Sequence, residues 1–367
     1  MAFDIETICS ATVETWLRFT LLPAVQPGMQ RDLLRHFGSA DAVLAAPRRE
    51  LEELVGATAA SALSQGPEAT IMERTRRWLA QPGCRLVGLG DAEYPPLWKQ
   101  IACPPAAFYA EGDAALLQRR TLAMVGSRNA TPHGEEDAFR FARELSDRGL
   151  AIVSGLAMGI DASAHRGALA GAGGTIAVLG TGPDVVYPPA NAALARDIAR
   201  RGCIVSEFPA STPPLDRNFP RRNRLISGLA LGVLVVEAAW PSGSLVTARC
   251  AVEQNRDVFA IPGSIHSPLA KGCHALIKQG AKLVDCVDDI LQELGLAQPQ
   301  ERDGPPADEK DVLTAMGYAA ATMDDIAERT GLDAATLAAR LSRLEIEGRV
   351  RSLAGGRFLR AEKRVIE

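Results

Sequence analysis

TLAMVGSRN, residues 121–129, passes from an apolar run directly into a loop that begins with glycine. Similar short runs recur along the chain, and their shortage of polar residues is typical of strands buried on both faces. Most intervals between them are long enough for a crossover helix. The runs are RLVGL (85–89), TLAMV (121–125), LAIV (150–153), TIAVL (175–179), CIVS (203–206), LGVLVV (231–236) and DVFAI (257–261). The pattern predicts an α/β fold, a Rossmann-like doubly wound parallel sheet, over residues 83–296.

Glycine-containing loops follow several of these predicted strands. GSRN follows residue 125, SGLAMGID follows 153, GTG follows 179, SGS follows 241 and PGS follows 261. Ligands of doubly wound sheets bind beyond the carboxyl ends of the strands, and glycine lets a backbone approach a phosphate closely. We therefore expect a groove for phosphates along one edge of the sheet.

Two further domains are expected on either side of the sheet. Residues 1–82 have helical apolar spacing, with Leu33, Leu34 and Phe37 on one face, and predict a small bundle of the SAM or helix-hairpin-helix kind. The proline and charge of residues 297–309 suit an extended linker. Residues 310–367 predict a winged helix, with a second helix over 334–347 and a wing marked by Gly348 and the glycine pair 355–356.

Composition restricts the classes of function. The 367 residues carry a formal net charge of −4, so a nucleic-acid site has to be a local positive patch. The seven cysteines are scattered without a CxxC pair, which favours thiols in a reducing cytosol over disulfides or zinc; Cys273 beside His274 is a poor metal site. Without a leader or an apolar run of membrane-spanning length, we expect a cytoplasmic protein with no membrane partner.

The usual nucleotide and catalytic fingerprints are missing. No GxGxxG follows a predicted strand, no GxxxxGK[ST] occurs, and the five histidines have no ligand spacing such as HExxH. The sequence therefore predicts no catalytic residue, no metal and no cofactor. The groove is left free for another polyanion.

The strongest local signal is NFPRRNRLISGL, residues 218–229. Arg217, Arg221, Arg222 and Arg224 lie within eight residues, and no acid occurs from residue 217 through 236. Phe219 among these arginines offers base stacking beside phosphate pairing. The alternative is a helix N-terminus with ordinary solvated arginines. Asn223 either contacts the ligand or clamps the loop backbone.

Two other loops add candidates. In GSRN, Gly126 admits a phosphate, Ser127 is positioned to cap a helix beginning near His133, and Arg128 supplies charge, unless it pairs with a neighbouring acid. Gly243 and Ser244 offer backbone N–H groups to an anion. Asp161 and His165, four residues apart, suit an acid–base pair, but we favour buried hydrogen bonds that lock a glycine-rich turn.

The chain resembles the DNA-processing protein A family, also called Smf. The resemblance is carried by YPPLW (94–98), GSRNATPHG (126–134), SGLAMGIDASAH (154–165), AVLGTGPDVVYP (177–188), SEFP (206–209), NFPRRNRLISGL (218–229), SGSLVTARCAVEQNRDVFAIPG (242–263) and KGCHALIKQGA (271–281). His133 departs mildly, since an aromatic is common there. The resemblance implies binding of single-stranded DNA in natural transformation, homodimerisation, recruitment of RecA, and no catalytic reaction. It places DNA contacts on Arg128, Phe219, Arg222, Asn223 and Arg224, with backbone help near Gly243.

The expected function is thus protection of incoming single-stranded DNA and loading of RecA in homologous recombination. The expected DNA-binding residues are Gly126, Ser127, Arg128, Arg217, Phe219, Arg221, Arg222, Asn223, Arg224, Gly243, Ser244 and Lys271, and the expected dimer residues are Leu276 and Ile277. One alternative is a phosphoribohydrolase of the Lonely Guy type, but PSGSLVTARC lacks the carboxylate of that family's PGGxGTxxE. A sequence-specific repressor acting through the winged helix would leave the glycine-edged domain unexplained.

Overall fold

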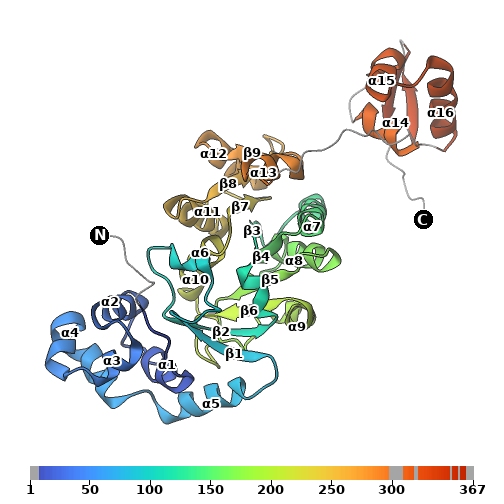
Figure 1. Ribbon diagram of the computed structural model, residues 1–367. Helices are drawn as coiled ribbons and strands as arrows, with labels where there is room; N and C mark the ends of the chain where they lie inside the picture. The colour runs from blue at the N-terminus through green and yellow to red at the C-terminus, as the bar shows by residue number, and fades with distance from the viewer. Residues whose placement is uncertain (1–7, 297–308, 318–320, 348, 354–355, 361–367) are drawn as a thin grey trace. The chain divides into compact units, whose positions relative to one another are not determined.

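The computed structural model describes residues 8–296, 309–317, 321–347, 349–353 and 356–360, in two compact units (Figure 1). The units are Met1–Ala297 and Gln298–Glu367. The predicted linker lies almost wholly outside the described residues, as do Gly348 and Gly355 of the predicted wing. No helix among the described residues is both long and apolar enough to span a membrane.

The first unit is built on a nine-stranded sheet in the order β1-β2-β6-β5-β4-β3-β7-β8-β9. Strands from β6 to β9 in this order are parallel, and β2 pairs antiparallel with β1 and β6. The chain builds outward from β3 through β4 to β6, then returns to place β7 on the other side of β3. This confirms the predicted doubly wound sheet. The strands are β1 (Cys84–Gly88), β2 (Ala107–Gly112), β3 (Thr121–Val125), β4 (Ala151–Ser154), β5 (Thr175–Leu179), β6 (Cys203–Ser206), β7 (Gly232–Val235), β8 (Asp257–Ala260) and β9 (Lys282–Leu283).

Helices cover both faces of the sheet because its central strands are buried on both. In β3, Leu122 and Met124 pack with α7, α8 and α13, whereas Ala123 and Val125 belong to the core on the side of α10 and α11. This alternation is the period of two expected of a strand. The helices are α6 (Pro96–Lys99), α7 (Pro132–Asp147), α8 (Ile160–Ala170), α9 (Ala192–Arg201), α10 (Asn218–Gly228), α11 (Gly243–Glu253), α12 (Lys271–Lys278) and α13 (Val287–Glu293), with 3-10 turns at Ala114–Gln118, Pro189–Asn191 and Pro268–Ala270.

The N-terminal helices share one apolar core with the sheet. Trp16 is 1% exposed and lies on Gly88 of β1, where a Cβ would come within 2.0 Å of the indole nitrogen. The helical bundle was predicted correctly, but the boundary at residue 82 stays a prediction, since the core crosses it. Its helices are α1 (Val13–Thr20), α2 (Pro27–Phe37), α3 (Ala40–Ala45), α4 (Arg48–Gln65, with a non-helical Gly56) and α5 (Ala69–Leu79).

The YPPLW motif anchors helix α10. Tyr94, Trp98 and Phe108 form an edge-to-face aromatic cluster, with centroids 4.9 to 6.2 Å apart. The indole of Trp98 donates a 2.9 Å hydrogen bond to the carbonyl of Leu225 in α10. The arginine-rich helix is therefore held on a buried aromatic base.

The second unit is the predicted winged helix. Leu337, Leu341 and Leu344 of its second helix are buried in a core of its own, as the sequence indicated. Strands β11 and β12 form the antiparallel wing, and β12 also pairs with β10. The elements are α14 (Glu309–Met316), β10 (Ala321–Thr322), α15 (Met323–Thr330), α16 (Ala334–Ile346), β11 (Val350–Leu353) and β12 (Arg357–Arg360).

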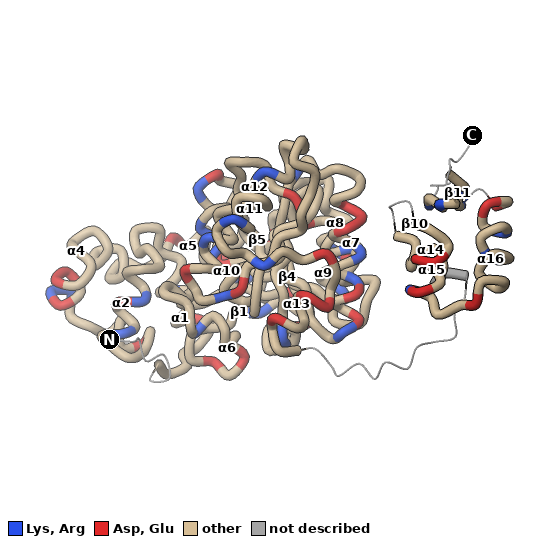
Figure 2. Tube along the Cα trace, turned by 90° about the horizontal axis from the view of Figure 1, so that it is seen from above, with Lys and Arg blue, Asp and Glu red and all other residues tan. Residues whose placement is uncertain are grey.

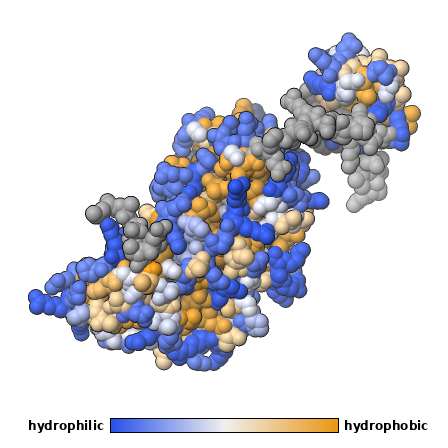
Figure 3. All heavy atoms as spheres, viewed as in Figure 1, coloured by the Kyte–Doolittle hydropathy of each residue, from blue (hydrophilic) through white to orange (hydrophobic). Residues whose placement is uncertain are grey.

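Basic, acidic and apolar residues are intermixed on the first unit. Basic and acidic residues are interspersed along its trace (Figure 2), so a single-sign coat is not present on the described residues. Apolar patches lie among hydrophilic ones on the face seen in Figure 3. Charge alone therefore does not locate a binding site, and the loops at the sheet edge have to be considered one by one.

Candidate nucleic-acid interface

Two loops meet where the strand order reverses, at the carboxyl ends of β3 and β7. The amide of Ser127 donates to the carbonyl of Glu237 at 2.7 Å. The carboxylate of Glu237 accepts from the Thr131 amide at 2.9 Å and from its hydroxyl at 2.7 Å. Glu237 thus fixes the loop after β3 at both of its ends. A cavity of about 440 Å³ opens here, at the position where doubly wound sheets bind their ligands.

Most of the predicted DNA-binding residues line this cavity. The lining includes Gly126, Ser127, Arg128, Phe219, Arg222, Asn223, Gly243 and Ser244. Arg217 and Arg221 line a different cavity, and Arg224 and Lys271 do not belong to the lining of either. Of the twelve residues predicted to bind DNA, the fold places eight around this one opening and four elsewhere.

The exposed Arg128 and the half-buried Phe219 lie together in the cavity wall. The guanidinium of Arg128 lies over the Phe219 ring, 5.7 Å from its centroid. Among the described residues no acid pairs with Arg128, which removes the alternative that it is neutralised by a neighbouring loop. A Cβ on Gly180 would lie 2.7 Å from the Phe219 ring, so the glycine after β5 makes room for that ring. Cation and aromatic face are thus presented together.

Arg222 lies beneath this pair and is 5% exposed. Its guanidinium donates to the carbonyls of Gly155, at 2.8 Å, and Val178. Burial lowers the pKa of Arg222 to about 10, while the nearby Asp161 carboxylate opposes the shift. The alternative of an ordinary solvated arginine is therefore wrong here. Arg222 places a buried positive charge at the floor of the cavity.

Arg224 points to the other side of α10. Its guanidinium pairs with Glu207 and donates to the carbonyl of Cys103 at 2.5 Å, and its side chain is 17% exposed. Burial disfavours its charge, but Glu207 more than compensates and raises the pKa of Arg224. Solvation is the wrong description of this arginine too. In this structure Arg224 fixes the helix, and its guanidinium is not presented to the cavity.

Asp161 and His165 are structural partners of the surrounding turn. The Asp161 carboxylate accepts from the amides of Gly155 at 3.1 Å and Ala157 at 3.3 Å. His165 instead lies 2.7 Å from the Thr175 hydroxyl, and burial lowers its pKa to about 3, so it is neutral. Burial raises the pKa of Asp161, although Arg222 partly offsets that effect. The interpretation as buried hydrogen bonds is confirmed.

Two finer expectations about caps and clamps have different outcomes. Ser127 does not cap α7; the N-cap is Thr131, whose hydroxyl accepts from the Gly134 amide at 3.0 Å. Ser127 accepts from the Asn129 amide instead, because the loop makes a local turn before the helix begins. Asn223 does act as a clamp, since its amide donates to the Gly243 carbonyl at 3.4 Å.

Three residues near the cavity were not among the site residues predicted from the sequence. Tyr187 is 42% exposed and its ring lies 5.7 Å from that of Phe219, and Trp240, next to the lining residue Ala239, is 59% exposed. Glu237, the residue that fixes the loop, was the third. The sequence signal for the aromatics was their position in YPP and WPS, directly after predicted strands or their loops. Exposed aromatics beside a cavity with cationic walls suit base stacking.

Helix α12 contains Lys271 and the predicted dimer residues Leu276 and Ile277. The Lys271 ammonium donates to the Ile265 carbonyl at 2.6 Å. Leu276 and Ile277 on α12 are half-buried and pack partly against the core. Cys273 is fully buried with its thiol toward the carbonyls of Val235 and Val236, so it does not face outward with His274 as a ligand pair would.

One group of described residues has metal-ligand spacing. Candidate ligand atoms of Asp285, Cys286 and Asp289 lie within 4.8 Å of one another. These residues surround the start of α13, and Asp289 accepts from the Asp285 amide at 3.1 Å. Acids at a helix N-terminus are favoured by the helix dipole, which accounts for the cluster without an ion.

The fold and this cavity define a class of protein: a doubly wound α/β domain with a glycine-edged crevice at its switch point, followed in the chain by a winged helix. The DNA recombination-mediator protein A family matches residues 85–295, and the DprA winged helix domain matches residues 296–356. The chain belongs to the DNA recombination-mediator protein A family.

Relatives and solved structures agree with this membership. Protein Smf of Escherichia coli is 43% identical over 298 residues, which cover 78% of this chain and 80% of that protein. DNA processing protein DprA of Streptococcus pneumoniae is 46% identical over 203 residues, covering 55% and 72%. The X-ray structure of the pneumococcal protein matches with a TM-score of 0.69 and 34% identity, over 77% of this chain and 99% of that one. A structure of the Helicobacter pylori protein, described for its single-stranded DNA binding mode, matches at 0.52 with 30% identity, over 57% and 95%.

Proposed function

We propose that the chain binds single-stranded DNA at the switch-point cavity, without a chemical reaction on the strand. The observation that carries this proposal is the pair formed by Arg128 and Phe219, a cation without an acidic partner among the described residues over a half-buried ring in the cavity wall. Such a pair offers a phosphate contact and a stacking platform within one nucleotide of each other. The Helicobacter pylori relative, whose structure is described for single-stranded DNA binding, supports the same ligand.

The electrostatics of the cavity support an anionic ligand. Arg222 holds a buried charge at the floor; burial lowers the pKa of Arg222 to about 10, and the nearby Asp161 carboxylate offsets this effect only in part. The N-terminus of α10 adds the positive end of a helix dipole, and the first turn contains no acid. Phosphates are therefore favoured at this opening.

A gel-shift comparison at two salt concentrations tests the proposal. We expect a single-stranded oligonucleotide to bind more tightly than the matching duplex, because bases stack on Phe219 only when they are unpaired. Affinity should fall with salt, with a slope of about −0.7 for each phosphate neutralised. Equal or tighter binding of the duplex would contradict the assignment and favour the winged helix as the main DNA site.

The proposed role extends to loading RecA on incoming DNA during natural transformation, as a cytoplasmic homodimer. A single cavity engages few nucleotides, whereas two cavities related by a twofold axis raise affinity through effective concentration. Leu276 and Ile277 are half-buried on α12, and Leu283 of the edge strand β9 is 45% exposed. We therefore place the dimer contact on α12 and β9.

Ile277→Arg is expected to split this dimer and leave the monomer folded. At the contact the substitution buries an unpaired charge, which is costly, whereas on a free surface the arginine is solvated. Light scattering should show a monomer, and affinity for long single strands should fall on the order of 10²-fold through lost bivalency. Gln279→Arg adds the same charge at an exposed position of α12's end and serves as the control. A folded monomer that still stimulates RecA-driven strand pairing would rule out the dimer mechanism.

A further inference from the structure

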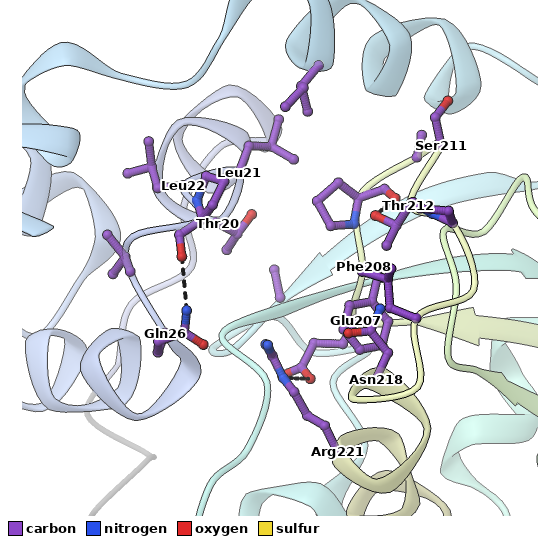
Figure 4. A pocket seen from close by; sticks show the side chains of 18 of the residues that line it. Thr20, Leu21, Leu22, Gln26, Glu207, Phe208, Ser211, Thr212, Asn218 and Arg221 are labelled. Carbon is purple, nitrogen blue, oxygen red and sulfur yellow. Dashed lines mark hydrogen bonds and ion pairs between the residues drawn. The ribbon is translucent and has the colours of Figure 1, made fainter.

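A second, larger cavity lies between the N-terminal helices and the segment that follows β6. Its volume is about 810 Å³. Figure 4 shows Thr20, Leu21, Leu22 and Gln26 on the side of the helical bundle, facing the segment around Phe208 and helix α10 across the opening. The switch-point cavity does not include these residues. Binding of single-stranded DNA at the switch-point cavity does not require this larger cavity.

The cavity has an excess of positive charge. Arg74 from α5 and Arg217 are exposed on its wall, and neither has an acidic partner among the described residues. The one lining acid, Glu207, is paired with Arg224 and lies 3.6 Å from the Nε of Arg221, so two arginines share one carboxylate. The positive end of α10 also faces this side, and the helix has no side-chain cap. This arrangement favours an anion.

The buried amide nitrogen of Asn218 has no hydrogen-bond partner among the described residues. The Nε of Arg221 and the second carboxylate oxygen of Glu207 face each other at 3.6 Å as an ion pair, so they are not free for a ligand in the same way. Asn218 is 5% exposed, and its side chain lies on the lining beside Arg221 (Figure 4). Buried polar groups in native structures are nearly always hydrogen-bonded. An unpartnered buried donor beside exposed cations indicates that a ligand supplies the missing acceptor.

The remaining wall suits a flat, partly apolar group. The guanidinium of Arg221 lies over the Phe208 ring, 5.3 Å from its centroid, which holds its plane in place. Leu21 and Val25 give the lining from the helical bundle an apolar character, and Leu215 adds to it from the segment before α10. Arginine planes stack on nucleobases. The amide nitrogen of Gln26 donates to the Pro23 carbonyl at 2.9 Å, which leaves its amide oxygen to accept from a base edge. The volume exceeds what a phosphate ion alone would fill.

We propose that this cavity is a second site that binds one nucleotide unit, with its phosphate at Asn218, Arg217 and Arg74 and its base against Arg221. The unit is either a free nucleotide or a nucleotide of the strand held at the switch-point cavity; the second case rests on the proposed function. Asn218 and Phe219 are consecutive in α10 and line the two cavities respectively. A strand therefore passes from one cavity to the other around the first turn of a single helix.

The test uses the full chain and two substitutions with matched controls. Asn218→Asp keeps the shape of the side chain but presents a carboxylate to the incoming phosphate; because Asn218 is 5% exposed, urea unfolding of the variant checks that the chain stays folded. Arg74→Ala removes a cation from the opposite wall. Arg77→Ala, on the same helix but outside the lining and paired with Glu73, is the control. The ligands are dTMP, thymidine, inorganic phosphate and an oligo(dT) that carries a photoreactive thymidine analogue.

We expect dTMP to bind measurably by calorimetry, and at least tenfold more tightly than thymidine or inorganic phosphate. Asn218→Asp should weaken dTMP at least tenfold and Arg74→Ala severalfold, with Arg77→Ala unchanged. If the source is the strand, photo-crosslinks from oligo(dT) should map to residues 20–30 and oligonucleotide affinity should respond to the same variants. Either dTMP binding that responds to these variants, or oligo(dT) crosslinks to residues 20–30, would support the site.

Three results would overturn the inference. Inorganic phosphate binding as tightly as dTMP would remove the base from the proposal. Oligonucleotide binding that depends on Arg128 and Phe219 but not on Asn218 or Arg74, without dTMP binding, would leave the switch-point function intact and reject the second site. Absence of oligonucleotide binding altogether would reject the proposed function, and the dTMP arm alone would then decide this site.

Discussion

Phe219→Ala is expected to weaken single-stranded DNA binding by about 1–3 kcal/mol, the usual effect of removing an aromatic stacking platform. The half-buried ring lines the switch-point cavity and lies against both Arg128 and Tyr187, so a stacked base would lose its principal partner. The salt dependence should barely change, because no charge is removed. Fluorescence anisotropy with a labelled oligonucleotide at several salt concentrations measures both quantities.

Arg128→Ala should produce the complementary pattern. It removes a cation that no described acid neutralises, so the salt slope should shrink by about 0.7 for one phosphate contact, equally for any base sequence. Arg140→Ala, an exposed arginine of α7 outside the cavity, is the control. Unchanged affinity and slope in both cavity variants would remove the DNA site from this opening.

Arg222→Met is expected to destabilise the fold by about 3–5 kcal/mol, because it leaves two buried carbonyls without their donor and a nearby buried carboxylate without its compensating charge. Asp161 would keep a buried carboxylate without its cation, and the carbonyls of Gly155 and Val178 would lose their donor. The Arg222 guanidinium packs directly on Gly155, where a Cβ would lie 2.5 Å from it. Urea unfolding of the full chain measures the loss of stability.

A control and a double variant separate this role from a direct DNA contact. Arg217→Met, at the exposed N-cap of the same helix, should leave the free energy of unfolding nearly unchanged. Asp161→Asn combined with Arg222→Met should recover part of the stability, because the uncompensated charge is gone. If Arg222→Met instead unfolds like the wild type and only loses DNA affinity, the arginine is a ligand contact and the buried network is not important.

The positions of the buried strands and the doubly wound class were predictable because each buried strand is a short apolar run, and several are followed by a glycine-containing loop. β2 was missed, since its AFYAEG ends in a polar pair and it pairs antiparallel at the side of the sheet where β1 covers it. β9 is two residues long and lacks an apolar run. Local sequence carries little information on either strand, because pairing partners far along the chain decide them.

The cavity residues were predictable by type more readily than by depth. The cluster of arginines after residue 216 correctly indicated positive charge, but spacing alone could not separate exposed Arg217 from buried Arg222 and Arg224. Their burial depends on Asp161 and Glu207, which come from loops after other strands. The second cavity was also beyond sequence reasoning, because its walls come from helices and a loop that meet only in the folded chain.

The packing of Trp16 on Gly88 makes residues of the helical bundle part of the same cooperative melting unit as the sheet. A substitution that loosens α1 would therefore lower the melting temperature of the whole first unit, including the switch-point cavity far from α1. The winged helix, with an independent set of buried leucines, can drift in sequence or be exchanged without that penalty. Substitutions in the N-terminal helices therefore affect the stability of the switch-point cavity, whereas substitutions in the separate core of the second unit do not.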